Sequence, residues 1–130
     1  KFKNAGLNNL STQVCTTINV FNIAYLDELA PYINEWNPDF WHINALHHPT
    51  ELEIQQLSLD VKKTITEKLS SSEIRKTEIK TALNYLNSEP DTALENYNDA
   101  LTDKIKQIDQ RRQENFGDVF PFLNNIFKNI

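Results

Sequence analysis

The sequence contains very few of the residues on which several common kinds of functional site depend. It has one cysteine, two glycines and no methionine among its 130 residues. The single cysteine, Cys15, cannot form an internal disulfide, which is typical of a protein from a reducing compartment. Two glycines are too few for loops that cradle phosphates or dinucleotides. The sequence therefore gives no indication of a disulfide scaffold, a phosphate loop or a dinucleotide fingerprint.

The sequence also lacks a long apolar run and an excess of positive charge. No apolar stretch approaches the length of a membrane span. The net charge is −5, which argues against a nucleic-acid surface. We therefore expect a cytoplasmic protein with no membrane and no nucleic acid among its partners. Because the chain starts at Lys1 and contains no methionine, we expect it to be one fragment of a larger protein.

The pattern of residues 14–46 predicts a strand, a helix and a second strand. Residues 14–21 are rich in β-branched and aromatic side chains and contain no glycine or proline, as in a strand. From Ile23 onward, apolar residues recur at spacings of three and four, which predicts a helix over about residues 24–35. Residues 40–46 form the second predicted strand. Two short strands joined by one helix usually lie parallel, so the fold class is α/β with a βαβ piece.

The rest of the sequence is mainly helical. Residues 50–57 predict an extended arm or a short turn, and Ser58 is suited to cap the following helix. The predicted helices cover residues 59–69, 73–86, 91–113 and 118–127. We therefore divide the chain into residues 1–57, which hold the βαβ piece, and a helical C-terminal region, residues 58–130.

Candidate ligand-binding residues lie at the predicted strands and their carboxyl ends. Asn22 and the pair His47 and His48 should share one edge of the sheet, where α/β folds place their ligand sites. Asn19 and Asn44 carry side-chain amides among apolar neighbours and must find hydrogen-bond partners. Simpler roles remain open, because Asn22 suits a helix cap and the histidines suit an ordinary loop.

Two further features of the sequence have a structural and a functional interpretation. Asp109 and Arg112 are three residues apart on a predicted helix, and Arg112 continues its apolar stripe. They can form an ion pair that fixes helix packing, or a clamp for an anionic partner. Cys15 is interpreted as a small buried apolar residue rather than a nucleophile.

Three stretches of the sequence together resemble a known family. They are residues 17–29, residues 44–49 with Leu57 and Lys62-Lys63, and residues 108–112 leading to Phe120-Pro121. In their order and spacing they resemble the distal half of radical S-adenosylmethionine proteins that contain a twitch domain. The resemblance implies the last strands of a partial (β/α) barrel, followed by C-terminal helices.

The resemblance implies an enzyme in which a [4Fe–4S] cluster cleaves S-adenosylmethionine reductively to form a 5′-deoxyadenosyl radical. The family holds this cluster with a CxxxCxxC loop, whereas this chain has only Cys15. Cluster ligation therefore falls to a missing N-terminal half of the same chain, and we expect this fragment alone to hold no cofactor and to be inactive. By position, the resemblance makes these residues candidates for lining the cofactor or substrate: Asn19, Asn22, Asn44, His47 and His48.

A second interpretation belongs to a different functional class. The chain would then be a small αβ interaction module without chemistry, which docks a partner through its apolar tail and long helix. The radical-enzyme hypothesis instead predicts an unknown substrate and an incomplete sheet with an exposed edge at the Val14 strand.

Overall fold

The structure is a computed structural model that describes residue 6 and residues 9–128. Residues 1–5, 7–8 and 129–130, which belong to the outer ends of the two predicted regions, lie outside the described residues. The strands are β1 (Gln13–Ile18) and β2 (Phe40–Ala45). The α-helices are α1 (Leu26–Trp36), α2 (Leu59–Ser70), α3 (Lys76–Leu86), α4 (Tyr97–Arg112), α5 (Phe116–Val119) and α6 (Pro121–Phe127). Three short 3₁₀ helices complete the described elements: η2 (Ile23–Tyr25), η3 (Thr50–Leu52) and η4 (Ile54–Gln56).

The two strands form a parallel sheet joined by η2 and α1, so the predicted α/β class and parallel pairing are confirmed. Their register runs from Gln13 opposite Phe40 to Ile18 opposite Ala45. Within the described part of the chain, β1 pairs with β2 and with no further strand. Among the described residues, the outer edge of β1 therefore has no strand partner, and the radical-enzyme hypothesis predicts such an edge.

The two faces of the sheet differ in composition and burial. Ile18, Trp41 and Ile43 on one face are buried, and the Trp41 Nε1–H donates to Thr16 Oγ1 at 2.9 Å. The opposite face is exposed and mostly polar, and consists of Gln13, Cys15, Thr17, Phe40, His42 and Asn44. The expectation that Cys15 is buried is wrong, because its position in the strand's alternation places it on the exposed face.

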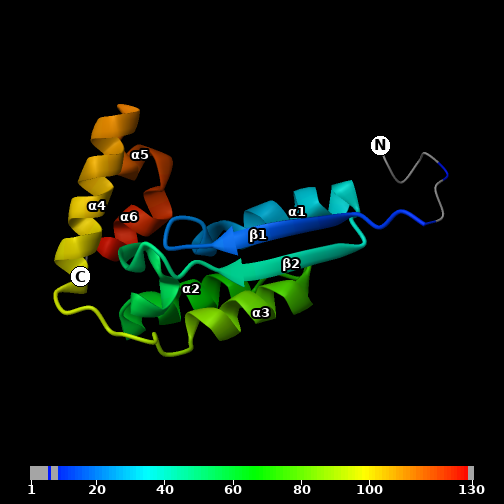
Figure 1. Cartoon of the computed structure of the whole chain (residues 1–130), viewed down its shortest axis with the longest axis horizontal. Coiled ribbons are helices and arrows are strands. Elements are labelled where there is room, and N and C mark those ends of the chain that lie inside the picture. Colours follow the sequence, from blue (N-terminus) through cyan, green and yellow to red (C-terminus); the bar gives the residue numbers. More distant parts are fainter. Residues whose placement is uncertain (1–5, 7–8, 129–130) are drawn as a thin grey trace.

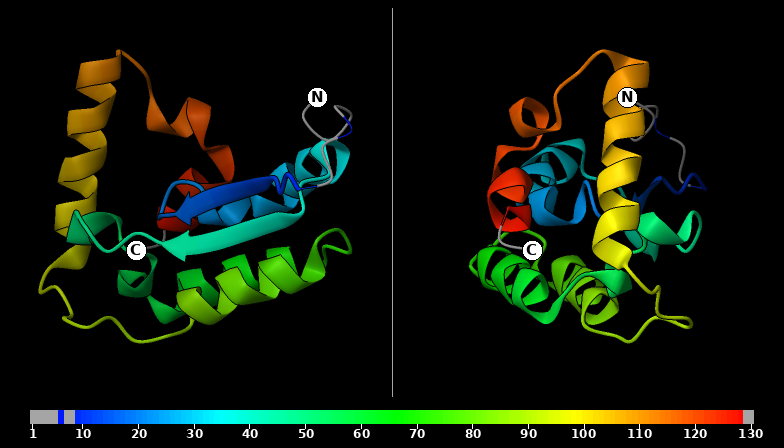
Figure 2. Two further views of the ribbon diagram at one scale, coloured as in Figure 1. Left: turned by 45° about the vertical axis from the view of Figure 1, so that its right-hand side comes forward. Right: turned by 90° about the vertical axis from the view of Figure 1, so that its left-hand side faces the viewer.

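The hydrophobic core lies between the buried face of the sheet and the helices α1, α2 and α3. Figures 1 and 2 show α1 along the sheet and α3 running beside β2, with α2 next to it. The largest fully buried side chains include Ile18, Ile33, Ile65 and Leu86. Each such side chain stabilises the fold by about 1.5–3 kcal/mol through burial. Core packing therefore stabilises one face of this two-stranded sheet.

Some helix ends match the sequence expectation and others do not. The Ser58 Oγ accepts the Val61 N–H at 3.5 Å, so the predicted cap of α2 is present. The helix α3 begins at Lys76 rather than at residue 73, and α4 begins at Tyr97 rather than at residue 91. Of the two alternatives for residues 50–57, the extended arm is wrong, because the segment forms two short 3₁₀ turns, η3 and η4.

The late start of α4 has a cause in long-range contacts. The Gln56 Nε2–H donates to the carbonyl oxygen of Thr92 at 2.7 Å, and Gln56 Oε1 accepts the Leu94 N–H at 3.0 Å. These bonds hold the backbone of the segment before α4 against η4. Asn96 then adopts the left-handed conformation, with φ of 53°, and α4 starts after it.

The helix α4 runs across the ends of the strands to which the arrows point in Figure 1. Its attachment to η3 is polar. The Lys104 Nζ lies 2.8 Å from Glu51 Oε1, and the Tyr97 hydroxyl donates to the Glu51 carbonyl oxygen at 3.3 Å. The helix therefore covers the carboxyl edge of the sheet, where parallel α/β folds bind ligands. Within residues 6 and 9–128, none of the helices has both the length and the apolar character needed to cross a membrane.

Candidate functional site

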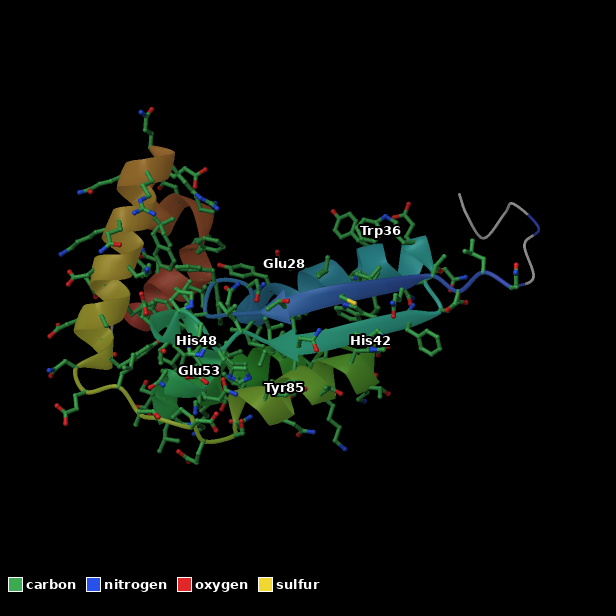
Figure 3. The ribbon with its side chains drawn as sticks, in the orientation of Figure 1. Glu28, Trp36, His42, His48, Glu53 and Tyr85 are labelled. Carbon is green, nitrogen blue, oxygen red and sulfur yellow. The ribbon has the colours of Figure 1, made fainter. Side chains whose placement is uncertain are left out.

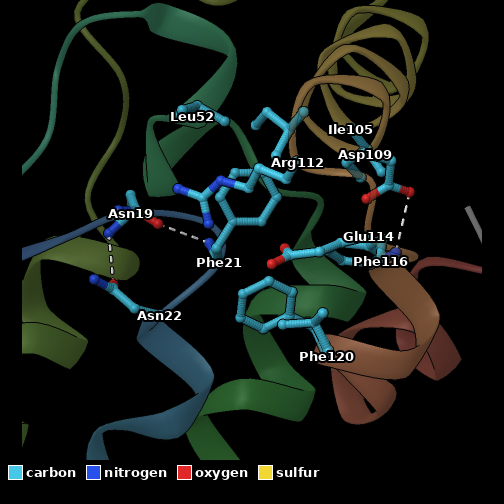
Figure 4. A pocket seen from close by; sticks show the side chains of 12 residues that line it. Asn19, Phe21, Asn22, Leu52, Ile105, Asp109, Arg112, Glu114, Phe116 and Phe120 are labelled. Atoms are coloured by element: carbon cyan, nitrogen blue, oxygen red, sulfur yellow. Dashed lines mark hydrogen bonds between the residues drawn. The ribbon is translucent and has the colours of Figure 1, made fainter.

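A cavity of about 350 Å³ lies at the carboxyl edge of the sheet (Figure 4). Its walls come from the turn after β1, from η3, and from the segment that runs from the end of α4 into α5. The apolar lining consists of Phe21, Leu52, Ile105, Ile108, Phe116, Val119 and Phe120. The polar lining consists of Asn19, Asn22, Asp109, Arg112 and Glu114. A largely apolar cavity with a few polar groups is the usual form of a small-molecule site.

Three phenylalanine rings form one wall of the cavity. The centroid of the Phe21 ring lies 5.9 Å from that of Phe116 and 5.7 Å from that of Phe120, and the last two are 5.4 Å apart. These separations are within the range in which aromatic rings attract one another. The contacts join the turn after β1 to α5, so they hold the cavity walls together.

Asn19 and Asn22 line the cavity, but most of their polar atoms bond within the turn that follows β1. Asn19 Oδ1 accepts the Phe21 N–H at 2.9 Å, and Asn22 Oδ1 accepts the Asn19 N–H at 2.8 Å. The Asn22 Nδ2–H donates to the Thr17 carbonyl oxygen at 2.9 Å. The Asn19 side-chain NH₂ makes no hydrogen bond with the described residues. It is therefore the amide donor that this turn leaves for a ligand.

Asp109 and Arg112 do not form the ion pair that their spacing suggested. Asp109 Oδ2 instead accepts the Phe116 N–H at 3.0 Å and so fixes the start of α5. No ion pair or hydrogen bond joins the Arg112 guanidinium to any other described residue. In Figure 4 its side chain extends from the last turn of α4 toward Asn19 and Phe21.

Glu114 brings a second charge to the cavity. Gln113 adopts the left-handed conformation, with φ of 54°, and its N–H donates to the Asp109 carbonyl oxygen, which ends α4. The chain turns there, and the Glu114 side chain points into the same space as Arg112 (Figure 4). Among the described residues, the Glu114 carboxylate has no hydrogen-bond or ion-pair partner. The cavity lining thus holds one cationic group, Arg112, and two anionic groups, Asp109 and Glu114. Arg112 and Glu114 are exposed to solvent, and neither forms an ion pair with a described residue.

The other three predicted site residues lie outside this cavity. Asn44 is on the exposed face of the sheet. His47 Nδ1 lies 3.1 Å from Oε1 of Glu53, a buried carboxylate whose Oε2 accepts the Gln56 Nε2–H at 2.9 Å. His48 is exposed, and Figure 3 labels it with Glu53 in the segment after β2. The structure therefore brings Asn19 and Asn22 together and leaves Asn44, His47 and His48 apart from them.

The described residues do not fit an iron–sulfur cluster. No group of three or more histidine, cysteine, aspartate or glutamate side chains in residues 6 and 9–128 is arranged to hold a metal ion. Cys15 is the only cysteine of the sequence, and a cluster of the implied kind takes three. Any such cluster needs cysteines from outside this sequence.

Sequence reasoning did not identify several residues that define the cavity. The strand predicted over residues 14–21 includes Phe21, whereas β1 ends at Ile18, and the sequence pattern indicates no binding role for Leu52, Glu114 or Phe116. Their common feature is that they meet only through tertiary contacts. The one usable signal was the polar run Asp109 to Arg112 followed closely by aromatic residues.

The chain was compared with family models, with curated proteins and with solved structures, and none of them matches it.

Proposed function

We propose that this chain is the distal part of a radical S-adenosylmethionine enzyme. It would line the cofactor and substrate side of a partial barrel whose cluster-binding half lies upstream. The observation that carries the proposal is a parallel βαβ unit with an open edge at β1 and a cavity at the carboxyl ends of its strands.

The open edge supports the proposal because a barrel wall continues from strand to strand. The outer edge of β1 offers unpaired backbone N–H and C=O groups, which readily accept another strand. Helices cover one face of the sheet, and the bare face carries polar side chains such as Thr17, His42 and Asn44. A polar inner face suits the interior of a barrel that holds a polar ligand.

The cavity supports the proposal by its location. In β/α folds, ligands bind at the carboxyl ends of the strands, in the loops that follow them. Asn19 and Asn22 lie in the loop after β1, and Leu52 lies in η3 after β2. We assign these residues a lining role and assign no residue of this chain a step at the cluster.

The test uses a longer protein that contains this chain and its upstream segment. After anaerobic reconstitution with iron and sulfide, we expect a reductant to drive cleavage of S-adenosylmethionine, measured as 5′-deoxyadenosine by chromatography. The variant Arg112→Gln should lower product formation on the natural substrate, whereas the matched variant Arg111→Gln, at a neighbour that does not line the cavity, should not. An upstream segment without CxxxCxxC, or a reconstituted protein that forms no 5′-deoxyadenosine, would refute the proposal.

A second candidate, a non-catalytic interaction module, is favoured by three exposed aromatic side chains. Tyr32, Trp36 and Phe40 are 59%, 62% and 55% exposed, and large exposed apolar groups often mark binding surfaces. The apolar tail is less available, because Leu123 is buried and Phe120 packs against the core. If the module hypothesis holds, replacing Tyr32 and Trp36 with serine should abolish binding of the partner. If the radical-enzyme hypothesis holds instead, the same replacements should leave S-adenosylmethionine cleavage intact.

A further inference from the structure

The charges in the cavity restrict the ligand that it can accept. Arg112 contributes one positive charge, and Asp109 and Glu114 contribute two negative charges. Asp109 is already engaged by the Phe116 N–H, whereas the Arg112 and Glu114 side chains are exposed to solvent and have no polar partner among the described residues. A ligand that carried only negative charge would meet the Glu114 carboxylate, and one that carried only positive charge would meet the Arg112 guanidinium. A ligand that carries both charges satisfies both groups.

The polar groups match the two ends of such a ligand. The guanidinium has five N–H donors in a planar fork, which suits a carboxylate, and the nearby Asn19 NH₂ adds another donor. The Glu114 carboxylate accepts hydrogen bonds from an ammonium group. Arg112 and Glu114 point into the same cavity without forming an ion pair with each other (Figure 4). Each of the two charged groups is therefore available to a ligand.

The remaining walls match an apolar side chain. Phe21, Phe116 and Phe120 form an aromatic wall, and Ile105 and Ile108 lie on the α4 side. The volume of about 350 Å³ is at the small end of the range for ligand sites. These walls suit a phenyl or branched aliphatic group better than a sugar, whose hydroxyls need hydrogen-bond partners.

We propose that the cavity binds a free α-amino acid with an apolar side chain, held by Arg112 and Asn19 at its carboxylate and by Glu114 at its ammonium group. That this amino acid is a substrate rests on the proposed function, whereas its binding to this chain needs no cluster. The methionyl end of S-adenosylmethionine carries the same pair of charges. The experiment therefore has to separate the two sources of this chemistry.

The test is calorimetric titration of this chain with L-phenylalanine and two blocked forms. N-acetyl-phenylalanine lacks the positive charge, and phenylalaninamide lacks the negative one. We expect saturable binding of L-phenylalanine, and binding at least about tenfold weaker for each blocked form, as for the loss of one charge-assisted hydrogen bond. Equal binding of the three compounds, or no binding of L-phenylalanine, would overturn the proposal. Binding of S-adenosylmethionine with no binding of L-phenylalanine would overturn it as well.

Matched variants link the binding to the named side chains. Arg112→Gln and Glu114→Gln should each weaken L-phenylalanine binding by at least about tenfold. Arg111→Gln and Glu67→Gln, at exposed positions away from the cavity, should leave it unchanged, and circular dichroism verifies that all four variants are folded. An unchanged affinity in the first pair would overturn the proposal. Because the titration uses no iron, sulfide or reductant, its failure is distinct from a failure of the radical-enzyme assay.

Discussion

The helices α1 and α4 have similar apolar stripes in the sequence but different surroundings in the structure. In α1, Ala30 and Ile33 are fully buried in the core. In α4, Leu101 near the start is buried, whereas Ile105 and Ile108 in the second half are only partly buried and line the cavity. The same helical pattern therefore serves tight packing in one element and borders a cavity in the other.

The difference follows from how each helix meets the sheet. The helix α1 lies along the sheet in Figures 1 and 2, and its apolar stripe, Leu26, Ala30 and Ile33, belongs to the buried core. The helix α4 runs across the strand ends, and only its first half meets η3 closely, through Tyr97 and Lys104. Hydrophobic periodicity identifies the inward face of a helix but does not tell whether core or cavity lies beyond it.

The strongest test of this comparison is a matched pair of substitutions. Ile33→Ala should lower the free energy of unfolding by about 2–5 kcal/mol, because it opens a void in a packed core. Ile108→Ala should lower it by less than about 1.5 kcal/mol, because its side chain already borders an open cavity. Urea unfolding followed by circular dichroism measures both. Equal losses would mean that the two helices are packed alike.

A substitution of Gln56 tests whether polar contacts fix the segment before α4. Its side chain bonds to Glu53, to the Thr92 carbonyl oxygen and to the Leu94 N–H. Gln56→Ala should lower the free energy of unfolding by about 1–3 kcal/mol, since these groups lose their partners. Gln110→Ala, at an exposed position of α4, should change it by less than about 0.5 kcal/mol. A similar result for the two variants in urea unfolding would contradict the role of Gln56.

Glycine in place of Gln113, the residue that ends α4, should stabilise the protein. Gln113 has a φ of 54°, a left-handed conformation that costs about 1 kcal/mol for residues with a Cβ atom. Gln113→Gly should therefore raise the free energy of unfolding by about 0.5–1 kcal/mol, whereas Gln110→Gly inside the helix should lower it by about 1 kcal/mol. Thermal unfolding of the two variants gives the sign of each change. A loss at both positions would show that Gln113 is not strained.

The smallest expected effect is a pH dependence at the η3 end of α4. The hydrogen bond from Lys104 lowers the pKa of the Glu51 carboxyl. A lowered pKa stabilises the fold above the pKa of the unfolded state, and this contribution disappears as the pH falls through the folded-state pKa. Both side chains are about a quarter exposed, so solvent screening limits the effect to about 0.5 kcal/mol.

The variant Glu51→Gln should therefore be less stable than the unmodified chain at pH 7 and nearly equal to it near pH 3. Urea unfolding at the two pH values measures the difference. Glu35→Gln, at an exposed position of α1, is the control and should show no such change. A Glu51→Gln difference that stayed constant with pH would contradict the ion pair.

Local sequence signals were sufficient for the βαβ unit. β-branched and aromatic residues indicated the first strand, the change of period at Ile23 indicated α1, and the hydroxyl of Ser58 indicated the start of α2. These features depend on residues close together in the chain. The sequence alone was therefore sufficient to predict them.

Features that depend on distant residues were missed. The start of α4 is delayed because Gln56 binds the segment before it. The spacing of Asp109 and Arg112 allowed an ion pair between them, but the Asp109 carboxylate accepts a hydrogen bond from the Phe116 N–H instead. Parallel pairing was sufficient to place Asn22 at the carboxyl edge, whereas Asn19 was predicted inside the first strand and lies in the turn after β1, which ends at Ile18. Whether they contact a cofactor stays a prediction.

The central claim is that the cavity at the carboxyl edge of the sheet binds a ligand. The direct measurement is a titration of this chain with L-phenylalanine, observed through the isoleucine δ1-methyl signals by NMR. We predict saturable shifts of Ile105 and Ile108, which line the cavity, with Ile33 and Ile79 in the core unmoved. Shifts of equal size in both pairs, or no shift in either, would contradict the account.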